Sequence, residues 1–357
     1  LVQNGDFSQI GSEEVTNGNF SQEGSELVTN GDFATDSDWN KNSNWTISGG
    51  TANCDGSSNG DLNQGTTLAT IGKSYEITYK VVSISQGGFF FKFGGVNGTV
   101  RNSIGVYTET IQAINTNRIA LDSNSFAIGS IDNVSVKEVG QDWSLGTGWS
   151  IGEDKAIANN VPNLGRLQSS GGTASVIGTT YKYSLNVSNI SGFYTIYVYG
   201  VIVQASVSSE GLIEGYVKAT STNGTVYING ASAGGLISGE FTNISVKEVG
   251  QNWVLGSGFS IGDDVAIGTS ATGVLYTNIT ITSSNKARIK ADVNISGGGI
   301  QLRVGGVSLG YFYDNIDYVF TSNGNGLVEF VGQSFTGSIT NISLIEITDD
   351  TNLPRIN

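Results

Sequence analysis

The 357-residue chain has no histidine, no methionine, a single cysteine and only two prolines. Histidine is the commonest general base and the commonest ligand of transition metals, so its absence excludes the usual forms of both kinds of site. Cys54 has no second cysteine to pair with, which excludes an intrachain disulfide and a cysteine-based zinc site. The chain must therefore be held together by burial, which a domain of about 100 residues can manage without covalent staples.

Basic residues are scarce as well. The chain carries 17 Lys and Arg against 31 Asp and Glu, a net charge of -14. A nucleic-acid partner requires clustered basic side chains, so we expect no nucleic-acid binding. The sequence contains no run of 18 apolar residues that would span a bilayer, and we expect no membrane insertion.

Repetition is the main positive signal in the chain. Trp39, Trp143 and Trp253 open equivalent segments that lie roughly 100 to 110 residues apart. This period is far longer than that of solenoid repeats and matches one small domain. The predicted organisation is a stalk at 1–26, three domains at 27–139, 140–249 and 250–348, and a linker at 349–357 that leads to a following segment.

Within the three domains the apolar residues alternate with polar ones. Residues 78–85, 181–188 and 287–295 all show this period of two, which places one face of a strand on a core and the other in water. Many of the 51 glycines separate short runs rich in Val, Ile, Thr and Tyr, as tight turns between strands do. We therefore predict an all-β protein of three tandem antiparallel β-sandwiches, each with roughly eight short strands.

A shorter repeat of 13 residues occupies the first 33 positions. Its core is Asn-Gly-Asp-Phe or Asn-Gly-Asn-Phe, at residues 4–7, 17–20 and 30–33. One such unit cannot bury a face alone, so it must pack on copies of itself, on other chains or on the first domain. We predict a stalk in which strands from several chains wrap together, which would make the protein a homo-oligomer, a trimer in the simplest case. The alternative is a duplicated linker with no fixed partner.

Aromatic residues recur in the second strand of each domain. An alignment of the three copies sets Phe89, Phe91 and Phe93 against Thr195, Tyr197 and Tyr199, and against Ile300, Leu302 and Val304. Because the same set is aliphatic in the third copy, we predict that this face points into the core. The hydroxyls of Tyr197 and Tyr199 need partners if they are buried, so these two residues are also candidates for ligand binding. The opening tryptophans are predicted to be core anchors, with stacking on a ligand as the alternative.

The sequence resembles two groups of known proteins. The phrase Asn-Gly-Asp-Phe before Trp39, together with the closing phrase at 131–136, is similar to the galactose-binding-like jelly rolls that include carbohydrate-binding modules of families 4 and 9. The repeated phrases at 143–152 and 24–33, and the tail at 351–357, resemble stretches of fibre and virion structural proteins of tailed phages, especially marine and Bacteroidetes phages.

The first resemblance implies a structural calcium site near the first strand and the closing aspartate of a domain. Only the first domain has acidic residues at both places, Asp32 and Asp132, because Thr242 and Thr340 stand at the closing position in the other two. Calcium prefers six to eight oxygen ligands. A calcium ion bound by Asp32 and Asp132 is therefore an expectation for the first domain alone, and no other cofactor is expected.

Neither the residues nor the resemblance points to an enzyme. No carboxylate pair recurs in all three copies outside turns, and the sequence has neither a nucleophile elbow nor a phosphate-binding loop. The leading hypothesis is a fibre or decoration subunit at the surface of a virion, or otherwise extracellular, with other virion proteins and surface glycans as partners. The alternatives are a secreted bacterial adhesin, the carbohydrate-binding arm of a polysaccharide-degrading protein, and a spacer or fibril without a ligand.

Overall fold

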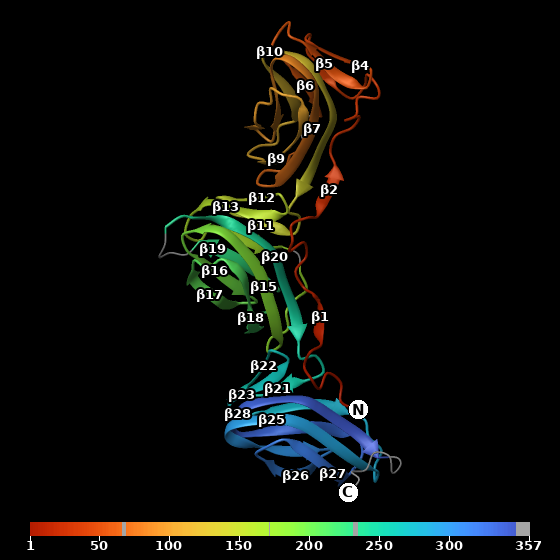
Figure 1. Ribbon diagram of the computed structural model, residues 1–357, viewed down its shortest axis with the longest axis vertical. Helices are drawn as coiled ribbons and strands as arrows, with labels where there is room; N and C mark the ends of the chain where they lie inside the picture. Colours follow the sequence, from red (N-terminus) through yellow and green to blue (C-terminus); the bar gives the residue numbers. More distant parts are fainter. Residues whose placement is uncertain (66–68, 171, 231–234, 348–357) are drawn as a thin grey trace.

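Alternating sequences form long antiparallel strands that stack as three β-sandwiches in one column (Figure 1). This computed structural model describes residues 1–65, 69–170, 172–230 and 235–347, and the predicted linker at 349–357 lies outside them. The described residues form strands and turns and no helix, and therefore no helix that is long and apolar enough to cross a membrane. The predicted all-β fold of tandem antiparallel jelly-roll sandwiches is confirmed.

Sandwich 1 owes its two layers to two strands that run through both of them. β7 and β10 pair along nearly their whole length, and their register shifts between Asn124 and Ile128, where the chain passes from one layer to the other. The strands of sandwich 1 are β3 (Asn40–Lys41), β4 (Trp45–Ser48), β5 (Thr51–Asp55), β6 (Asp61–Gln64), β7 (Ser74–Phe93), β8 (Val96–Asn97), β9 (Gly105–Gln112) and β10 (Ile119–Val139).

Sandwich 2 has two separate sheets, in the orders β12-β13-β20-β15-β18 and β11-β14-β19-β16-β17. Its strands are β11 (Trp143–Leu145), β12 (Trp149–Gly152), β13 (Lys155–Val161), β14 (Arg166–Ser169), β15 (Thr180–Ser191), β16 (Tyr194–Val198), β17 (Val201–Val207), β18 (Gly211–Lys218), β19 (Val226–Gly230) and β20 (Ile237–Val249).

Sandwich 3 again uses two long strands for both layers, β25 and β28, which pair along most of their length. Its strands are β21 (Val254–Leu255), β22 (Phe259–Gly262), β23 (Val265–Ala271), β24 (Val274–Ile279), β25 (Lys286–Val304), β26 (Val307–Phe312), β27 (Ile316–Thr321) and β28 (Gly326–Ile347).

Each sandwich encloses its own cluster of buried apolar side chains. The opening tryptophans Trp39, Trp143 and Trp253 are buried, as predicted for core anchors. The face of β7 that carries Phe89 and Phe91 also points into the core as predicted, since neither side chain has exposed surface. Burial of such large side chains is the main source of stability in domains without covalent cross-links.

The N-terminal residues 1–33, which we call the strap, run beside the column from sandwich 3 to sandwich 1 (Figure 1). Strand β1 (Ile10–Glu13) pairs with β20 of sandwich 2, and β2 (Glu23–Glu26) pairs with β10 of sandwich 1. Each of the three Asn-Gly-Asp/Asn-Phe turns, which we call plugs, docks on a different sandwich. Plug 1 (residues 4–7) docks on sandwich 3, plug 2 (17–20) on sandwich 2 and plug 3 (30–33) on sandwich 1.

This position of residues 1–26 differs from the separate multichain stalk that the repeat predicted. The reason is that every plug phenylalanine finds a tryptophan of its own chain: Phe7 packs on Trp253, Phe20 on Trp143 and Phe33 on Trp39, with ring centroids 5.3, 4.9 and 5.3 Å apart. All three phenylalanines are only 1% exposed. The repeats thus complete the sandwiches of their own chain, in the reverse of their order in the sequence.

Neighbouring sandwiches touch through a hairpin that recurs. At the junction of sandwiches 1 and 2, the Ile151 amide at the end of β12 donates a hydrogen bond to the Ser74 hydroxyl at 3.3 Å. At the junction of sandwiches 2 and 3, the Asp263 amide after β22 donates to the Tyr216 hydroxyl at 2.9 Å. The β12–β13 and β22–β23 hairpins are therefore equivalent contacts that link the sandwiches of the column.

Candidate functional site

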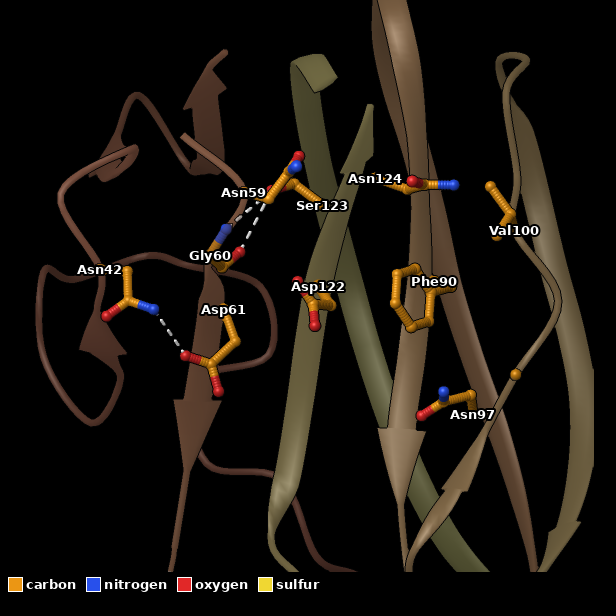
Figure 2. Close-up of a pocket in the computed structure, with 11 residues that line it drawn as sticks. Asn42, Asn59, Gly60, Asp61, Phe90, Asn97, Val100, Asp122, Ser123 and Asn124 are labelled. Atoms are coloured by element: carbon orange, nitrogen blue, oxygen red, sulfur yellow. Dashed lines mark hydrogen bonds between the residues drawn. The ribbon is translucent and has the colours of Figure 1, made fainter. Parts of the chain in front are cut away.

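A groove of about 600 Å³ crosses one outer face of sandwich 1 (Figure 2). Its floor is built from Asp61 on β6, Asp122 on β10 and Phe90 on β7. The register pairs Asp122 with Asp61 on one side and with Phe90 on the other, so the three side chains stand in a row. Its walls carry the amides of Asn42, Asn59, Asn97 and Asn124 and the side chain of Val100.

Strand alternation explains why these residues face outward. Successive side chains on a strand point to opposite faces of the sheet. Phe91 and Leu121 are buried in the core, so their neighbours Phe90 and Asp122 must lie on the other face. The inward-facing residues of each strand stabilise the sandwich, and the outward-facing residues can line a binding surface.

Both carboxylates of the groove floor have fixed partners. Asp61 accepts hydrogen bonds from the amide of Asn42 at 2.8 Å and from the guanidinium of Arg118 at 2.9 Å. Asp122 forms an ion pair with Lys92, whose ammonium lies 5.1 Å from the centroid of the Phe90 ring. The floor therefore presents neutralised, oriented polar groups beside one aromatic ring.

A second depression of about 380 Å³ borders the groove and shares Asp61 and Asn97 with it. It is lined in addition by Lys92 and Arg118. The two depressions together form an elongated polar surface across the sheet. Such a surface suits an extended ligand rich in hydroxyl groups, because planar amides and paired carboxylates offer many donors and acceptors.

A buried hydrogen-bond network holds the groove wall that carries Asn59. The Ser123 hydroxyl lies 3.2 Å from both the amide and the carbonyl oxygen of Gly60, and the Asn44 amide donates to that hydroxyl at 3.2 Å. The Trp45 indole N–H also donates to the Gly60 carbonyl at 2.9 Å. The segment before β6 is thus fixed from beneath, which preorganises the wall for binding.

The same face of sandwich 2 is chemically different. Arg166 stands at the register position of Asp61, and Tyr197 stands at that of Lys92. The rings of Tyr197 and Tyr227 stack with centroids 4.2 Å apart, and the Arg166 guanidinium lies 4.0 Å from the Tyr227 centroid. Burial raises the pKa of Tyr227 above its ordinary value. This face is an aromatic and cationic platform.

On the corresponding face of sandwich 3, Gln301 takes the position of Phe90 and Val331 that of Asp122. The Arg303 guanidinium donates to the Gln301 side-chain oxygen at 2.9 Å. The three sandwiches therefore share a scaffold but differ in the outward residues of one sheet. The combination of carboxylates, asparagines and a phenylalanine around a groove is found on sandwich 1.

Of the two tyrosines predicted as ligand-binding candidates, the structure places Tyr197 outward and Tyr199 in the core. Tyr199 has no exposed surface, packs edge-on against Tyr181 at 4.7 Å, and burial raises the pKa of its hydroxyl. Its φ of 50° marks the turn position that Gly94 occupies in sandwich 1. The predicted alignment was one residue out of register here, so Tyr199 cannot reach a ligand and Tyr194, not Thr195, matches Phe89.

The structure brings the predicted calcium residues to neighbouring segments, because the Val134 amide donates to the Gly31 carbonyl at 2.9 Å. Asp32 accepts from the Ala34 amide, and Asp132 accepts from the Asn133 amide. Within the described ranges, no three acidic, cysteine or histidine residues cluster as a metal site would. Calcium at Asp32 and Asp132 therefore stays a prediction.

The sequence reading did not single out Asp61, Asp122 or the asparagines that line the groove. The signal that could have led to the groove is the alternation of this strand, which puts Phe90 and Lys92 on the face opposite Phe89, Phe91 and Phe93. The missing information was the pairing of β6 with β10, which brings Asp61 beside Asp122 from a distant part of the chain.

Comparisons with known proteins place the chain in no family. No family model matches it. No curated protein matches it either. Among solved structures, the tandem CBM22-1-CBM22-2 domain of Xyn10C from Paenibacillus barcinonensis aligns over 67% of this chain and 98% of its own, at 10% identity and a TM-score of 0.20. A triple jelly-roll protein from the turret assembly of an archaeal virus aligns over 94% of this chain and 89% of its own, at 15% identity and a TM-score of 0.18. Superpositions this loose carry no inference about ligands or assembly.

Proposed function

We propose that this protein is a non-enzymatic structural protein of a virion, a fibre or decoration subunit that attaches to surface glycans through the groove of sandwich 1. The observation that carries the glycan part is the row of Asp61, Asp122 and Phe90 with four asparagine amides around it (Figure 2). A sugar ring offers hydroxyls to carboxylates and amides and an apolar face to an aromatic ring. A single groove of this kind binds weakly, and many copies on one particle would give high avidity.

A glycan array probed with the full chain, displayed in many copies on beads, tests the glycan part. Phe90→Ala and Asn124→Ala should each reduce retention of the glycans that bind, because the first removes the stacking surface and the second a groove amide. Gln301→Ala is the matched control, since Gln301 holds the Phe90 position on sandwich 3. Equal loss in the control, or no binding at high density, contradicts a glycan site in this groove.

The elongated column of sandwiches in Figure 1 supports the fibre or decoration part of the proposal. Two alternatives from other classes remain in competition: a secreted bacterial adhesin or carbohydrate-binding arm, and a ligand-free spacer. Capsid and tail genes next to the gene favour the virion, whereas a catalytic domain in the same polypeptide favours the carbohydrate-binding arm. Absence of glycan binding in every format would favour the spacer.

A calcium ion at Asp32 and Asp132 is part of the same proposal. In sandwich 3 the hydroxyl of Thr340, which stands at the position of Asp132, donates to the Asp264 carbonyl at 3.2 Å and lies 3.5 Å from the Asp6 carbonyl. In sandwich 2, Thr242 donates to the Asp154 carbonyl at 3.1 Å. The carboxylate of Asp132 has no proton to donate to a carbonyl, unlike the threonine hydroxyls at this position in the other two sandwiches. A cation between Asp132 and the corresponding carbonyls of sandwich 1 would take the place of that proton.

A further inference from the structure

The three plugs are bound by slots of the same design. In each slot a tryptophan indole N–H donates to the plug asparagine carbonyl: Trp253 to Asn4, Trp143 to Asn17 and Trp39 to Asn30, at 3.0, 2.9 and 3.0 Å. A backbone amide of the closing strand donates to the plug glycine carbonyl, from Ile342, Ile244 and Val134, at 2.9, 2.8 and 2.9 Å. The asparagine side chains agree in plugs 1 and 2, where Asn4 and Asn17 donate to the carbonyls of Gln251 and Gln141, whereas Asn30 of plug 3 donates to the carbonyls of Thr35 and Ser37. The slots of sandwiches 2 and 3 therefore make the same contacts with their plugs, which indicates that they recognise the plug motif and not its place in the chain.

The motif itself is strictly required by the slot. A Cβ on Gly5, Gly18 or Gly31 would lie 2.0, 1.8 or 2.0 Å from the carbonyl oxygen of the closing strand. The phenylalanines of all three plugs have left-handed φ angles between 50° and 61°, which turn their rings back onto the tryptophans. Glycine at the contact and phenylalanine in this conformation define a sequence-specific ligand for each slot.

A second contact reinforces plugs 2 and 3. The carboxylate of Glu13 accepts hydrogen bonds from the Val246 amide at 2.8 Å and the Ser245 hydroxyl at 2.6 Å. Glu26 makes the same pair of contacts on sandwich 1, with the Val136 amide and the Ser135 hydroxyl. The strap thus contains two units that each bring a strand, a carboxylate and a plug to one sandwich, β1 with plug 2 on sandwich 2 and β2 with plug 3 on sandwich 1, while plug 1 alone docks on sandwich 3.

The units are joined by short exposed connectors. Ser21 and Gln22, between plug 2 and β2, are exposed, and among the residues that the structure describes their backbone amides donate only to the side chains of Asn19 and Asn17 of the strap itself. Opening the chain at this connector would release β1 with plugs 1 and 2 from sandwiches 2 and 3 and leave plug 3 on sandwich 1. The same contacts would form again if a released strap met the slots of another molecule.

We propose that the slots of sandwiches 2 and 3 also accept the strap of a second copy of this chain, so that the protein assembles by strap exchange. Exchange of an identical element between protomers replaces every contact it breaks, which makes it a low-cost route to oligomers. Residues 1–22 of one chain would then bridge to the sandwiches of its neighbour. This gives the N-terminal repeats an assembly role without a separate stalk, and it does not depend on glycan binding.

Cysteine cross-linking tests the exchange in the full chain. A Cβ built on Gly11 lies 3.2 Å from the Glu248 Cβ, slightly closer than the ~3.5 to 4.5 Å of a disulfide, and 2.6 Å from the Gln251 side-chain nitrogen, which is the end of a flexible side chain that can move aside. The double variant Gly11→Cys, Glu248→Cys should form an intrachain disulfide, which proves that the geometry is suitable. A concentrated mixture of the two single variants should form a disulfide-linked dimer under the same oxidation. No linked dimer from the mixture, while the double variant closes, overturns the proposal.

A matched control uses the equivalent pair on sandwich 1. A Cβ built on Gly24 lies 3.3 Å from the Glu138 Cβ, but the unit of Gly24 lies beyond the connector and remains on its own chain. A mixture of the single variants Gly24→Cys and Glu138→Cys should therefore give no linked dimer. If both mixtures give equal amounts of dimer, random collision explains the product and the exchange is contradicted.

A peptide provides an independent readout. The full chain with Phe20→Ala has a weakened plug 2, and a synthetic peptide of residues 10–22 should bind the slot and restore hydrogen-exchange protection in sandwich 2. The same peptide with Phe20→Ala should not restore it. Failure of the wild-type peptide at millimolar concentration would show that the slot accepts a plug only from its own chain, against the proposal.

Discussion

Replacing Phe7 by alanine should destabilise sandwich 3, although residue 7 lies more than 200 positions before that sandwich in the sequence. Phe7 is 1% exposed, its ring lies 5.3 Å from that of Trp253, and it belongs to the buried cluster of sandwich 3. The substitution removes this ring and leaves the backbone contacts of plug 1 in place. Its effect therefore reports the apolar part of plug binding.

The expected loss is a large fraction of the stability of one domain. A phenylalanine buries roughly 150 to 250 Å², which at about 25 cal/mol per Å² corresponds to about 4 to 6 kcal/mol. Phenylalanine-to-alanine substitutions in protein cores cost about 3 to 5 kcal/mol, in agreement with this range. Domains are stable by only about 5 to 15 kcal/mol, so the variant should leave sandwich 3 close to its unfolding threshold.

Hydrogen exchange with peptide-level resolution is the appropriate assay. Phe7→Ala should lower protection in β25 and β28 and leave β7 and β10 unchanged, whereas Phe33→Ala should do the opposite. Phe193→Ala, at a 41% exposed position before β16, is the control and should change stability by less than about 0.5 kcal/mol. Loss of protection in sandwich 1 after Phe7→Ala, with sandwich 3 unaffected, would refute the pairing of plugs with sandwiches.

Three further changes test other contacts. Burial first, and then the charges of Glu23 and Asp154, raise the pKa of Glu76 above its ordinary value of 4.5. The stability that Glu76 contributes is therefore fully present below pH 4.5 and is lost as the pH rises through the folded-state pKa. Glu76→Gln should therefore raise the melting temperature at neutral pH and have no such effect in acid, as calorimetry across pH would show. Tyr216→Phe removes the acceptor for the Asp263 amide and should cost about 1 kcal/mol at the junction of sandwiches 2 and 3. Residual dipolar couplings should then show a wider spread in the relative orientation of these two sandwiches. An unchanged spread would mean that the contact does not fix the junction. Calcium should raise the melting temperature of the wild-type chain but not that of Asp132→Thr, which installs the residue found in the other two sandwiches; an equal response of both proteins would remove Asp132 from the calcium proposal.

Much of the fold could be predicted from local pattern. The alternation around Tyr79, Tyr183 and Ile289 predicts strands with one face in a core, and each of these side chains is in fact buried. The recurrence of Trp39, Trp143 and Trp253 predicted core anchors, because a large side chain kept at the same place in all three copies fills the same part of each core. The alignment of the three copies was less accurate in the second strand of sandwich 2. The sequence sets Tyr199 against Phe93, because nothing local shows that Tyr199 occupies the turn position of Gly94.

The candidate site was less accessible to the sequence. The predicted inward face of Phe89, Phe91 and Phe93 leaves Phe90 and Lys92 on the opposite face, but a groove also depends on which strands are neighbours. Asp61 and Asp122 lie far apart in the chain and meet because β6 and β10 pair. Long-range strand pairing depends on the packing of the whole sandwich, and local periodicity does not encode it.

By itself the sequence determined that the protein is all-β, that three units repeat, and that histidine and disulfide chemistry have no place in it. These properties follow from composition and from the period of two, which act locally. Only the tertiary structure decided what the 13-residue repeats do. The motif shows that a plug needs a partner, but three tryptophan slots of the same kind exist in the chain. Plug 3 directly precedes sandwich 1 in the chain, and the strap extends from there along the column past sandwich 2 to sandwich 3, so plugs 2 and 1 meet those sandwiches in turn (Figure 1).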